Sequence, residues 1–133
     1  YLSYDDGRTW TGFNAKSEWG LRYARCVSIK PGTNEAYLAI GDSTPGFTSK
    51  VLKSTDLGKT WQEVTLTQSP NSTFWAFGKH ASDATVMFAG SKYGHLFRSR
   101  DGGATWIKEW REFSEITDVA WVPVRTEDNP VKH

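Results

Sequence analysis

The sequence is poor in several features that would point to particular classes of protein. It has one cysteine, Cys26, and so forms no internal disulfide. Sixteen Lys and Arg residues nearly balance fifteen Asp and Glu residues, which gives no electrostatic basis for binding nucleic acid or an anionic membrane. No apolar run approaches the roughly 20 residues of a membrane-spanning helix. We therefore expect no nucleic-acid partner and no membrane insertion.

Signatures of bound metals and cofactors are also missing. No Cys or His spacing matches a zinc site, no loop matches an EF-hand, and no glycine-rich stretch is suited to cradle a phosphate. No segment has an amphipathic helical period over about ten residues. We expect no cofactor, no metal site and little helix.

What the chain does contain is aromatic residues and glycine. It has seven Trp, seven Phe, five Tyr and twelve Gly. Frequent aromatic residues and glycine-bearing turns at even spacing are typical of an all-β repeat fold.

One eight-residue phrase occurs three times, at Ser3–Trp10, Ser54–Trp61 and Ser99–Trp106. All three copies fit the pattern S-x-D-x-G-x-T-W. A unit that recurs every 40–50 residues or so is the signature of a repeat array or a propeller blade.

Each fixed position of the phrase suits a tight reversal between two strands. The glycine can adopt a positive φ at little steric cost. The aspartate, serine and threonine can bond to the loop's own backbone. The tryptophan begins the next strand and offers a large apolar face, which we expect to be largely buried between blades. The residues expected to be structural in this way are Ser3, Asp5, Gly7, Thr9 and Trp10; Ser54, Asp56, Gly58, Thr60 and Trp61; and Ser99, Asp101, Gly103, Thr105 and Trp106.

The repeated phrase resembles the Asp box of the bacterial-neuraminidase-repeat superfamily of β-propellers. That superfamily includes sialidases, two-propeller xyloglucanases, sortilin-type receptors and a photosystem II assembly factor. The resemblance implies an all-β propeller whose Asp boxes lie on the face opposite any catalytic site. It also favours an extracytoplasmic location, either periplasmic or secreted.

With the Asp boxes as anchors, the remaining strands can be placed. We expect a partial propeller: two complete four-stranded blades plus strands of a third, in residues 1–124, followed by a polar tail, 125–133. Aligning Tyr37 with Met87 predicts that these residues occupy equivalent positions in their blades. The expected strands are 9–13, 23–29, 36–40, 50–53, 60–66, 73–79, 86–89, 96–98, 105–110 and 116–122.

Two blades do not close a propeller, which typically has about 4–8 of them. We expect the remaining blades to come from a longer chain or from self-association. The chain begins inside a strand, which favours a piece of a longer protein.

The loops opposite the Asp boxes are the expected binding surface, because ligands favour converging loops on a rigid frame. Aromatic side chains there can stack on sugars, and arginines can clamp carboxylates. Each residue also has a purely structural interpretation, as loop packing or as a solvated charge. The candidate ligand-binding residues are Trp19, Arg22, Phe47, Tyr93, Arg111 and Glu112.

Two classes of function fit these features. The first is a non-catalytic binding or assembly module that presents its loop face to a protein or a glycan. The alternative is part of a glycoside hydrolase, either exo-sialidase-like or xyloglucanase-like. The Arg-Ile-Pro motif of sialidases is absent from these 133 residues, and Glu112 and Glu115 are the only clustered carboxylates on the loop face. No catalytic residue is assigned.

Overall fold

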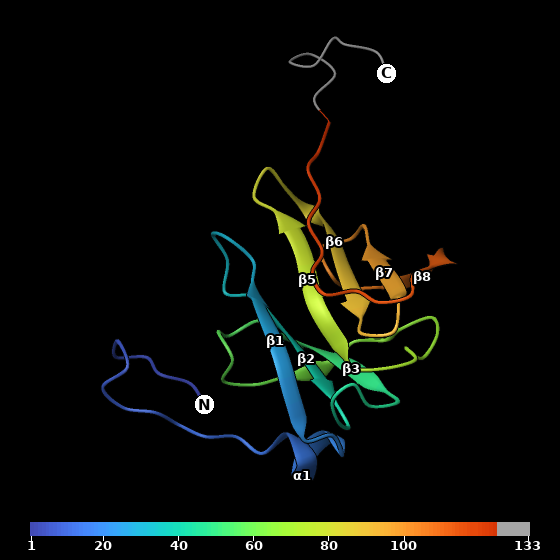
Figure 1. Cartoon of the computed structure of the whole chain (residues 1–133). Coiled ribbons are helices and arrows are strands. Elements are labelled where there is room, and N and C mark those ends of the chain that lie inside the picture. The colour runs from blue at the N-terminus through green and yellow to red at the C-terminus, as the bar shows by residue number, and fades with distance from the viewer. Residues whose placement is uncertain (125–133) are drawn as a thin grey trace.

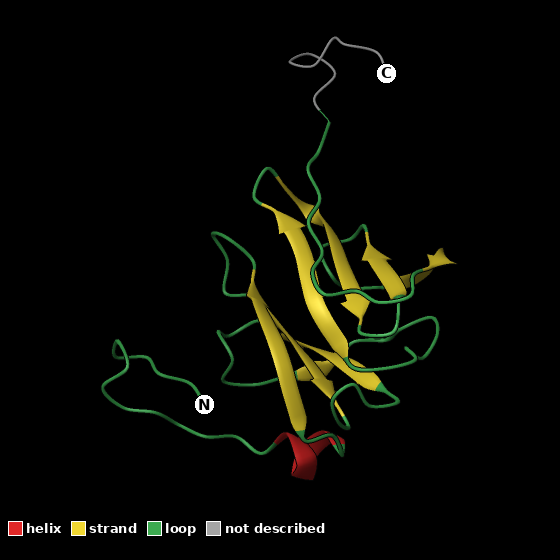
Figure 2. Ribbon diagram, in the orientation of Figure 1, coloured by secondary structure: helices red, strands yellow, loops and turns green. Residues whose placement is uncertain are grey.

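Two four-stranded antiparallel sheets follow one another along the chain in the computed structural model, which describes residues 1–124 (Figures 1 and 2). They confirm the expected all-β fold, a partial β-propeller with two complete blades. The expected tail 125–133 lies outside the described residues. The first sheet contains β1 (Tyr23–Ile29), β2 (Ala36–Gly41), β3 (Ser49–Ser54) and β4 (Gln62–Glu63); the second contains β5 (Phe74–His80), β6 (Asp83–Ser91), β7 (His95–Ser99) and β8 (Ile107–Glu112).

A five-residue helix, α1 (Ala15–Trp19), precedes β1. Asn14 caps it, because its Oδ1 atom accepts hydrogen bonds from the Lys16 and Ser17 amides at 3.1 and 3.3 Å. Gly20 ends it with a φ of 76°. No helix within residues 1–124 has the length and apolar character needed to cross a membrane.

Hydrogen bonds within each Asp box hold its loop between two strands. In the second box, Ser54 Oγ accepts a bond from the Gly58 amide at 2.7 Å and donates one to Asp56 at 2.8 Å. Asp56 accepts bonds from the Thr60 amide and hydroxyl at 2.9 and 2.6 Å. The same set recurs in the other two boxes. The residues that recur in all three boxes therefore serve to close the loop.

The two blades share one apolar core. Its buried members come from both sheets: Tyr37, Ala39, Val51 and Val64 from the first blade, and Phe74, Met87, Ala89, Phe97 and Trp106 from the second. The Tyr37 hydroxyl also donates a hydrogen bond to the Gly102 carbonyl oxygen. A second cluster, which includes Leu38, Ile40 and Leu52, lies on the other face of the first sheet.

The three Asp-box tryptophans are buried to different degrees. Trp106 is fully buried against Tyr37, with ring centroids 6.5 Å apart. Trp61 is half-buried and stacks on Phe13 at 6.2 Å. Trp10 is 62% exposed, so the expectation that all three are largely buried is wrong for this one. Within the described residues, no earlier blade lies against Trp10.

The predicted equivalence of Tyr37 and Met87 is also wrong. Both side chains lie in the shared core, one from each blade. The first sheet therefore turns Tyr37 toward the second blade, whereas the second sheet turns Met87 back toward the first. A slip of one residue in the alignment reverses the face of every side chain in a strand, and this is the error here.

Three expected strands differ from the structure. The segment 9–13 has only an isolated bridge between Leu2 and Thr11, and 60–66 is reduced to β4 and a bridge from Leu66 to Trp106. Residues 116–122 form no strand. A strand needs a ladder of backbone hydrogen bonds to a neighbour, and within the described residues this segment has only one such bond, from the Ile116 amide to the Lys92 carbonyl oxygen.

Residues 116–122 lie instead across the face of the second blade that points away from the shared core (Figure 1). A Cβ atom on Gly78 would stand 2.7 Å from Val119, and one on Gly90 would stand 2.6 Å from Ile116. The aromatic rings of Phe88 and Trp121 are 6.3 Å apart. Small residues in β5 and β6 thus make room for a segment that packs where the next blade of a propeller would begin.

Candidate functional site

The loops opposite the Asp boxes form one connected surface that spans both blades. It comprises α1, the β2–β3 loop (residues 42–48), the connection 68–73, the β6–β7 loop (residues 92–94) and residues 113–118. In Figure 1 these segments gather at the lower ends of the first-blade strands and of β5 and β6. We call this surface the loop face.

Backbone hydrogen bonds tie these loops to one another. Thr73 donates its amide to the Pro45 carbonyl oxygen at 2.8 Å and its hydroxyl to Ser43 at 2.6 Å. The Thr73 carbonyl oxygen accepts a bond from the Lys92 amide at 2.9 Å. The Ile116 amide then donates to the Lys92 carbonyl oxygen at 3.1 Å. This series of hydrogen bonds runs from the β2–β3 loop of the first blade to Ile116. It makes the loop face a rigid support for side chains.

Two of the predicted binding residues present free aromatic rings on the loop face. Phe47 is 87% exposed, and its loop is held by Asp42, which accepts a hydrogen bond from the Phe47 amide at 3.0 Å. Tyr93 is 50% exposed, and its amide donates to Ser72 Oγ at 2.8 Å. Asn71 adds a bond to the Tyr93 carbonyl oxygen at 2.8 Å. Both rings are therefore fixed through their backbones while their side chains remain available.

Two other predicted residues lie at the first blade. Trp19 packs edge-on against Phe13 at 6.1 Å and is only half-exposed, so much of its ring is used in loop packing. Arg22 is exposed and lines a hollow of about 550 Å³ together with Lys16 and Asn14. The structure does not bring Arg22 next to Phe47 or Tyr93 in that hollow.

The remaining pair, Arg111 and Glu112, are consecutive residues of β8. The guanidinium of Arg111 lies 5.6 Å from the centre of the Trp110 ring. Glu112 accepts a hydrogen bond from Lys108 at 2.8 Å and lies 3.3 Å from His95 Nε2. Glu115 pairs with Lys92 instead. The two glutamates are thus directed to different lysines.

Seven carboxyl groups of the described chain are in environments that favour the charged form. The hydrogen bond from Lys108, together with its charge, lowers the pKa of Glu112. Burial raises the pKa of Asp42, but hydrogen bonds from the Phe47 and Thr48 amides outweigh it and the net shift is downward. Every carboxyl whose pKa departs clearly from its usual value has it lowered, in Asp5, Glu35, Asp42, Asp56, Asp83, Asp101 and Glu112. A general acid of a glycosidase needs a raised pKa, and none of these residues has one.

Sequence reasoning did not anticipate a stack of cations on Trp75, at the loop-face end of β5. The Arg25 guanidinium lies 3.8 Å from the centre of the Trp75 ring, and Lys92 Nζ lies 4.8 Å from it. Arg25 and Trp75 fall in the expected strands 23–29 and 73–79. These strands lie side by side in the structure, and placing them so from the sequence could have suggested the contact.

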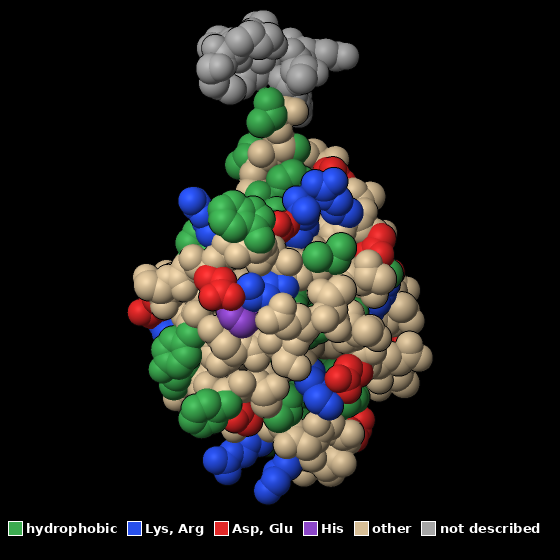
Figure 3. Space-filling model, turned by 90° about the vertical axis from the view of Figure 1, so that its right-hand side faces the viewer, with side chains coloured by type: hydrophobic (Ala, Val, Ile, Leu, Met, Phe, Trp, Pro, Cys, Tyr) green, Lys and Arg blue, Asp and Glu red, His purple; other side chains and the backbone are tan. Residues whose placement is uncertain are grey.

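Charges of both signs are interspersed on the surface that carries β7 and β8 (Figure 3). Ion pairs such as Arg98–Glu109, at 2.8 Å, neutralise charges on this surface. Among residues 1–124, no three His, Cys, Asp or Glu side chains gather in a way that could hold a metal ion.

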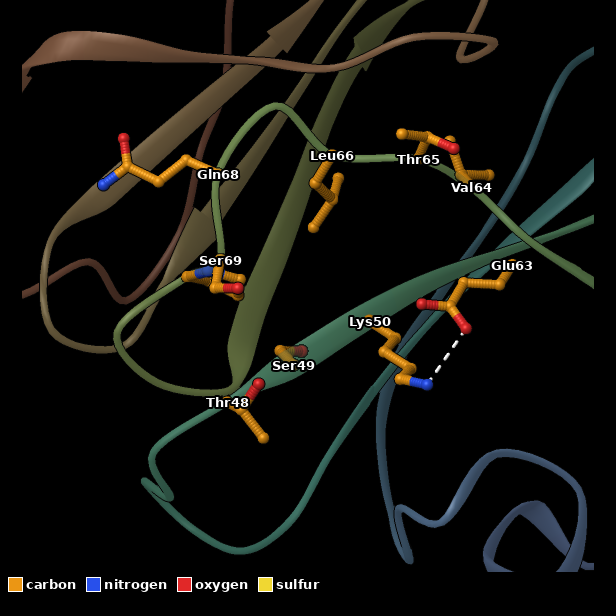
Figure 4. A pocket seen from close by; sticks show the side chains of 10 residues that line it. Thr48, Ser49, Lys50, Glu63, Val64, Thr65, Leu66, Gln68 and Ser69 are labelled. Carbon is orange, nitrogen blue, oxygen red and sulfur yellow. Dashed lines mark hydrogen bonds and ion pairs between the residues drawn. The ribbon is translucent and has the colours of Figure 1, made fainter.

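A polar hollow of about 410 Å³ lies beside the outer strands of the first blade (Figure 4). Its walls are the start of β3, the chain from β4 onward, and the connection toward the second blade. Lys50 and Glu63 form an ion pair of 2.9 Å at one end. The lining residues are Thr48, Ser49, Lys50, Glu63, Val64, Thr65, Leu66, Gln68, Ser69 and Pro70.

Three comparisons relate this arrangement to known proteins. A xyloglucanase from Paenibacillus sp is 30% identical over 109 residues, which are 74% of this chain and 11% of that protein. A xyloglucanase from Hypocrea jecorina (strain QM6a) is 26% identical over 141 residues, covering 98% of this chain and 16% of that protein. The crystal structure of the Niastella koreensis GH74 enzyme is 26% identical, with a TM-score of 0.49, over 68% of this chain and 15% of that one.

The chain therefore spans only a small part of the length of the xyloglucanases it resembles. The sequence profile described as "Sortilin, neurotensin receptor 3" matches residues 1–129, which is nearly all of the chain. Together with two Asp-box blades, this match shows that the chain belongs to the Sortilin-Vps10 family of Asp-box β-propeller proteins.

Proposed function

We propose that these two blades form part of the glycan-binding surface of a propeller protein related to xyloglucanases, and that they bind the polysaccharide without supplying the catalytic acids. The observation that carries the proposal is the pair of exposed rings, Phe47 and Tyr93, on loops that are tied together by hydrogen bonds. Aromatic rings held in this way can stack on sugar rings with little loss of conformational entropy.

The carboxylates support binding rather than cleavage by these blades. A glycosidase uses two carboxyl groups, one with a raised pKa, at a separation of about 5–10 Å. Glu112 has a lowered pKa and is committed to Lys108, while Glu115 is committed to Lys92.

A second candidate is that the intact protein is itself a glycoside hydrolase, and the names of both curated relatives favour it. Its acidic pair would then include residues outside this chain. The exo-sialidase-like version has less support, since the Arg-Ile-Pro motif is absent here and neither curated relative is named as a sialidase.

The test measures binding of xyloglucan by the intact protein with Tyr93→Ala. We expect about 5- to 20-fold weaker binding from the loss of one stacked ring, with an unchanged melting temperature. The control is Tyr4→Ala, since Tyr4 is 56% exposed but belongs to the first Asp box. Equal affinity for xyloglucan in the Tyr93 variant and the parent would refute the proposal and leave a protein ligand as the alternative partner.

A further inference from the structure

Trp110 is the most exposed tryptophan of residues 1–124, with 85% of its surface accessible to solvent against 62% for Trp10. It lies in β8, the outermost strand of the second blade (Figure 1). Its indole ring offers a ligand a large apolar face. Arg111 beside it was predicted from the sequence as a ligand-binding residue, whereas Trp110 was not.

The position of Trp110 in its blade stays exposed even where a following blade is present. Trp110 is the fourth residue after the Asp-box tryptophan Trp106, and its equivalent in the first blade is Thr65, the fourth residue after Trp61. Thr65 is exposed, although the second blade lies beside it and Leu66 is bridged to Trp106. The exposure of Trp110 is therefore a property of its position in the blade and not of an open end of the array.

A β-bulge in β8 carries the exposed ring. In β7, Phe97 pairs with Lys108 of β8. The next pair is His95 with Glu112, so β8 has three residues between its paired positions where β7 has one. Trp110 is the middle residue of these three. A bulge of this kind interrupts the ladder and re-aims the side chains of the extra residues.

Ion pairs brace the bulge. Glu109 is paired with Arg98 of the neighbouring strand at 2.8 Å. Lys108 and Glu112, the residues at the two ends of the bulge, form an ion pair of 2.8 Å across it. The segment that presents Trp110 is therefore held in place before a ligand arrives, and stacking on its ring requires little ordering of the chain.

The groups beside the ring suit an uncharged ligand that carries hydroxyl groups. The carboxylates of Glu109 and Glu112 are engaged with basic partners, whereas Arg111 forms no ion pair within residues 1–124. Its guanidinium lies 5.6 Å from the centre of the Trp110 ring, and its N–H groups can donate hydrogen bonds to hydroxyls. A single apolar ring between hydrogen-bonding groups fits a sugar better than a protein, because the centre of a protein interface is a broader apolar surface.

Trp110 lies within reach of a ligand that is bound at Tyr93. The Phe113 amide donates a hydrogen bond to the Gly94 carbonyl oxygen at 3.0 Å, which joins the end of β8 to the loop that carries Tyr93. Since consecutive Cα atoms are about 3.8 Å apart, this path places the Cα atoms of Tyr93 and Trp110 no more than about 22 Å from each other. A polysaccharide segment of several sugar units can contact both rings.

We propose that Trp110 and Arg111 form an outer sugar-binding subsite that extends the loop face, and that one uncharged sugar unit of the polysaccharide stacks on the Trp110 indole. The proposal rests on the proposed function, because it continues the same glycan-binding surface beyond Phe47 and Tyr93. Only a chain long enough to occupy both places gains from the outer subsite. Trp110 therefore favours long chains over short ones.

The experiment compares the binding of cellohexaose and of cellotriose to the intact protein by calorimetry. With Trp110→Ala we expect about 5- to 20-fold weaker binding of cellohexaose and a change below about 2-fold for cellotriose, which the rings of Phe47 and Tyr93 still hold. Trp110→Tyr keeps an aromatic ring and should recover most of the affinity. The matched control is Ile107→Ala, which truncates another exposed apolar side chain of β8 and should leave both affinities within about 2-fold.

A second measurement follows the indole N–H signals in NMR spectra of the intact protein with isotope-labelled tryptophan. We expect a saturable shift of the Trp110 signal as cellohexaose is added, with Trp110→Tyr identifying that signal. The Trp10 signal should not shift, because Trp10 belongs to the first Asp box and its indole N–H donates to the Gly7 carbonyl oxygen at 3.0 Å.

Three results would overturn the proposal: no shift of the Trp110 signal, equal weakening of cellohexaose and cellotriose binding by Trp110→Ala, or equal weakening of cellohexaose binding by Trp110→Ala and Ile107→Ala. The first result would leave a protein contact as the use of this ring. These outcomes differ from failure of the proposed function. If Tyr93→Ala leaves glycan binding unchanged, the proposed function fails, and the Trp110 signal still tests the outer subsite.

Discussion

The guanidinium carbon of Arg25 lies 3.8 Å from the centre of the Trp75 ring, so the inner strands of two successive blades are joined by a cation–π contact. Arg25 lies in β1 and Trp75 in β5. A guanidinium stacks on an indole through its flat face, which a lysine ammonium does not reproduce. The contact therefore joins two blades where their apolar core ends.

This contact can be measured with a double-mutant cycle of Arg25→Ala and Trp75→Leu. Because Arg25 is exposed, we expect a coupling free energy of about 0.5–1 kcal/mol in chemical denaturation. Arg25→Lys should recover less than half of it. Additive effects of the two substitutions would show that the stack contributes nothing to stability.

Glycine 103 is expected to be less tolerant of substitution than Gly32, although both have a positive φ, of 88° and 71°. A Cβ atom on Gly103 would stand 2.4 Å from the Tyr37 ring, whereas one on Gly32 would meet nothing within 4 Å. Gly32→Ala should cost only the backbone strain, about 1–2 kcal/mol. Gly103→Ala should add about 1–3 kcal/mol of overpacking.

Denaturant midpoints of the two alanine variants decide this prediction. Shifts of equal size would mean that Tyr37 moves aside freely, in conflict with its full burial and its hydrogen bond to Gly102.

The Asp boxes should make stability fall at acid pH. Hydrogen bonds from the Thr105 hydroxyl and amide lower the pKa of Asp101 from 3.8 to about 2. A carboxyl with a lowered folded-state pKa stabilises the protein fully above its unfolded pKa, and this contribution is lost as the pH falls toward about 2. The difference in melting temperature between the parent and Asp101→Asn should therefore be largest near neutral pH and shrink between pH 4 and 2.

The control for that titration is Asp118→Asn, since Asp118 belongs to no Asp box and is exposed. A difference between parent and Asp101→Asn that stays constant down to pH 2 would contradict the role of the ionised form.

Cys26 should be inert in the folded protein. Burial raises the pKa of its thiol to about 12, against a usual value of 9.0, and the thiolate is the reactive form. We expect no labelling of Cys26 by a thiol reagent at pH 8 in native conditions and rapid labelling after denaturation. Mass spectrometry of the peptide that contains Cys26 gives the measurement, and fast labelling of the native protein would show that β1 opens readily.

Much of the fold could be predicted from the sequence because the Asp box encodes its own geometry. The side chains of Ser54, Asp56 and Thr60 form hydrogen bonds only within their loop, so a local pattern was enough to place the hairpins. β1 was predicted with its observed bounds, and the other blade strands within a few residues, except for the short β4.

Features that depend on neighbours across the fold could not be predicted in this way. The exposure of Trp10 depends on what packs against it, and no blade precedes it within the described residues. A shift of one residue in strand register changes the face of the sheet on which the Met87 side chain lies. At the candidate site, residue types identified Phe47 and Tyr93 as available rings, but not the use of Trp19 in packing or the hollow beside Gln68, which arises where three separate segments meet.

The shared core has a consequence for protein engineering. Since Tyr37 and Trp106 come from different blades and pack against each other, a single sheet excised between β4 and β5 would expose its side of the shared core. The exchangeable unit of this array is the junction, from the second half of one blade to the first half of the next. Chimaeras whose crossover points lie within a sheet, at the Asp-box loop, should therefore fold better than those joined in the connection between blades.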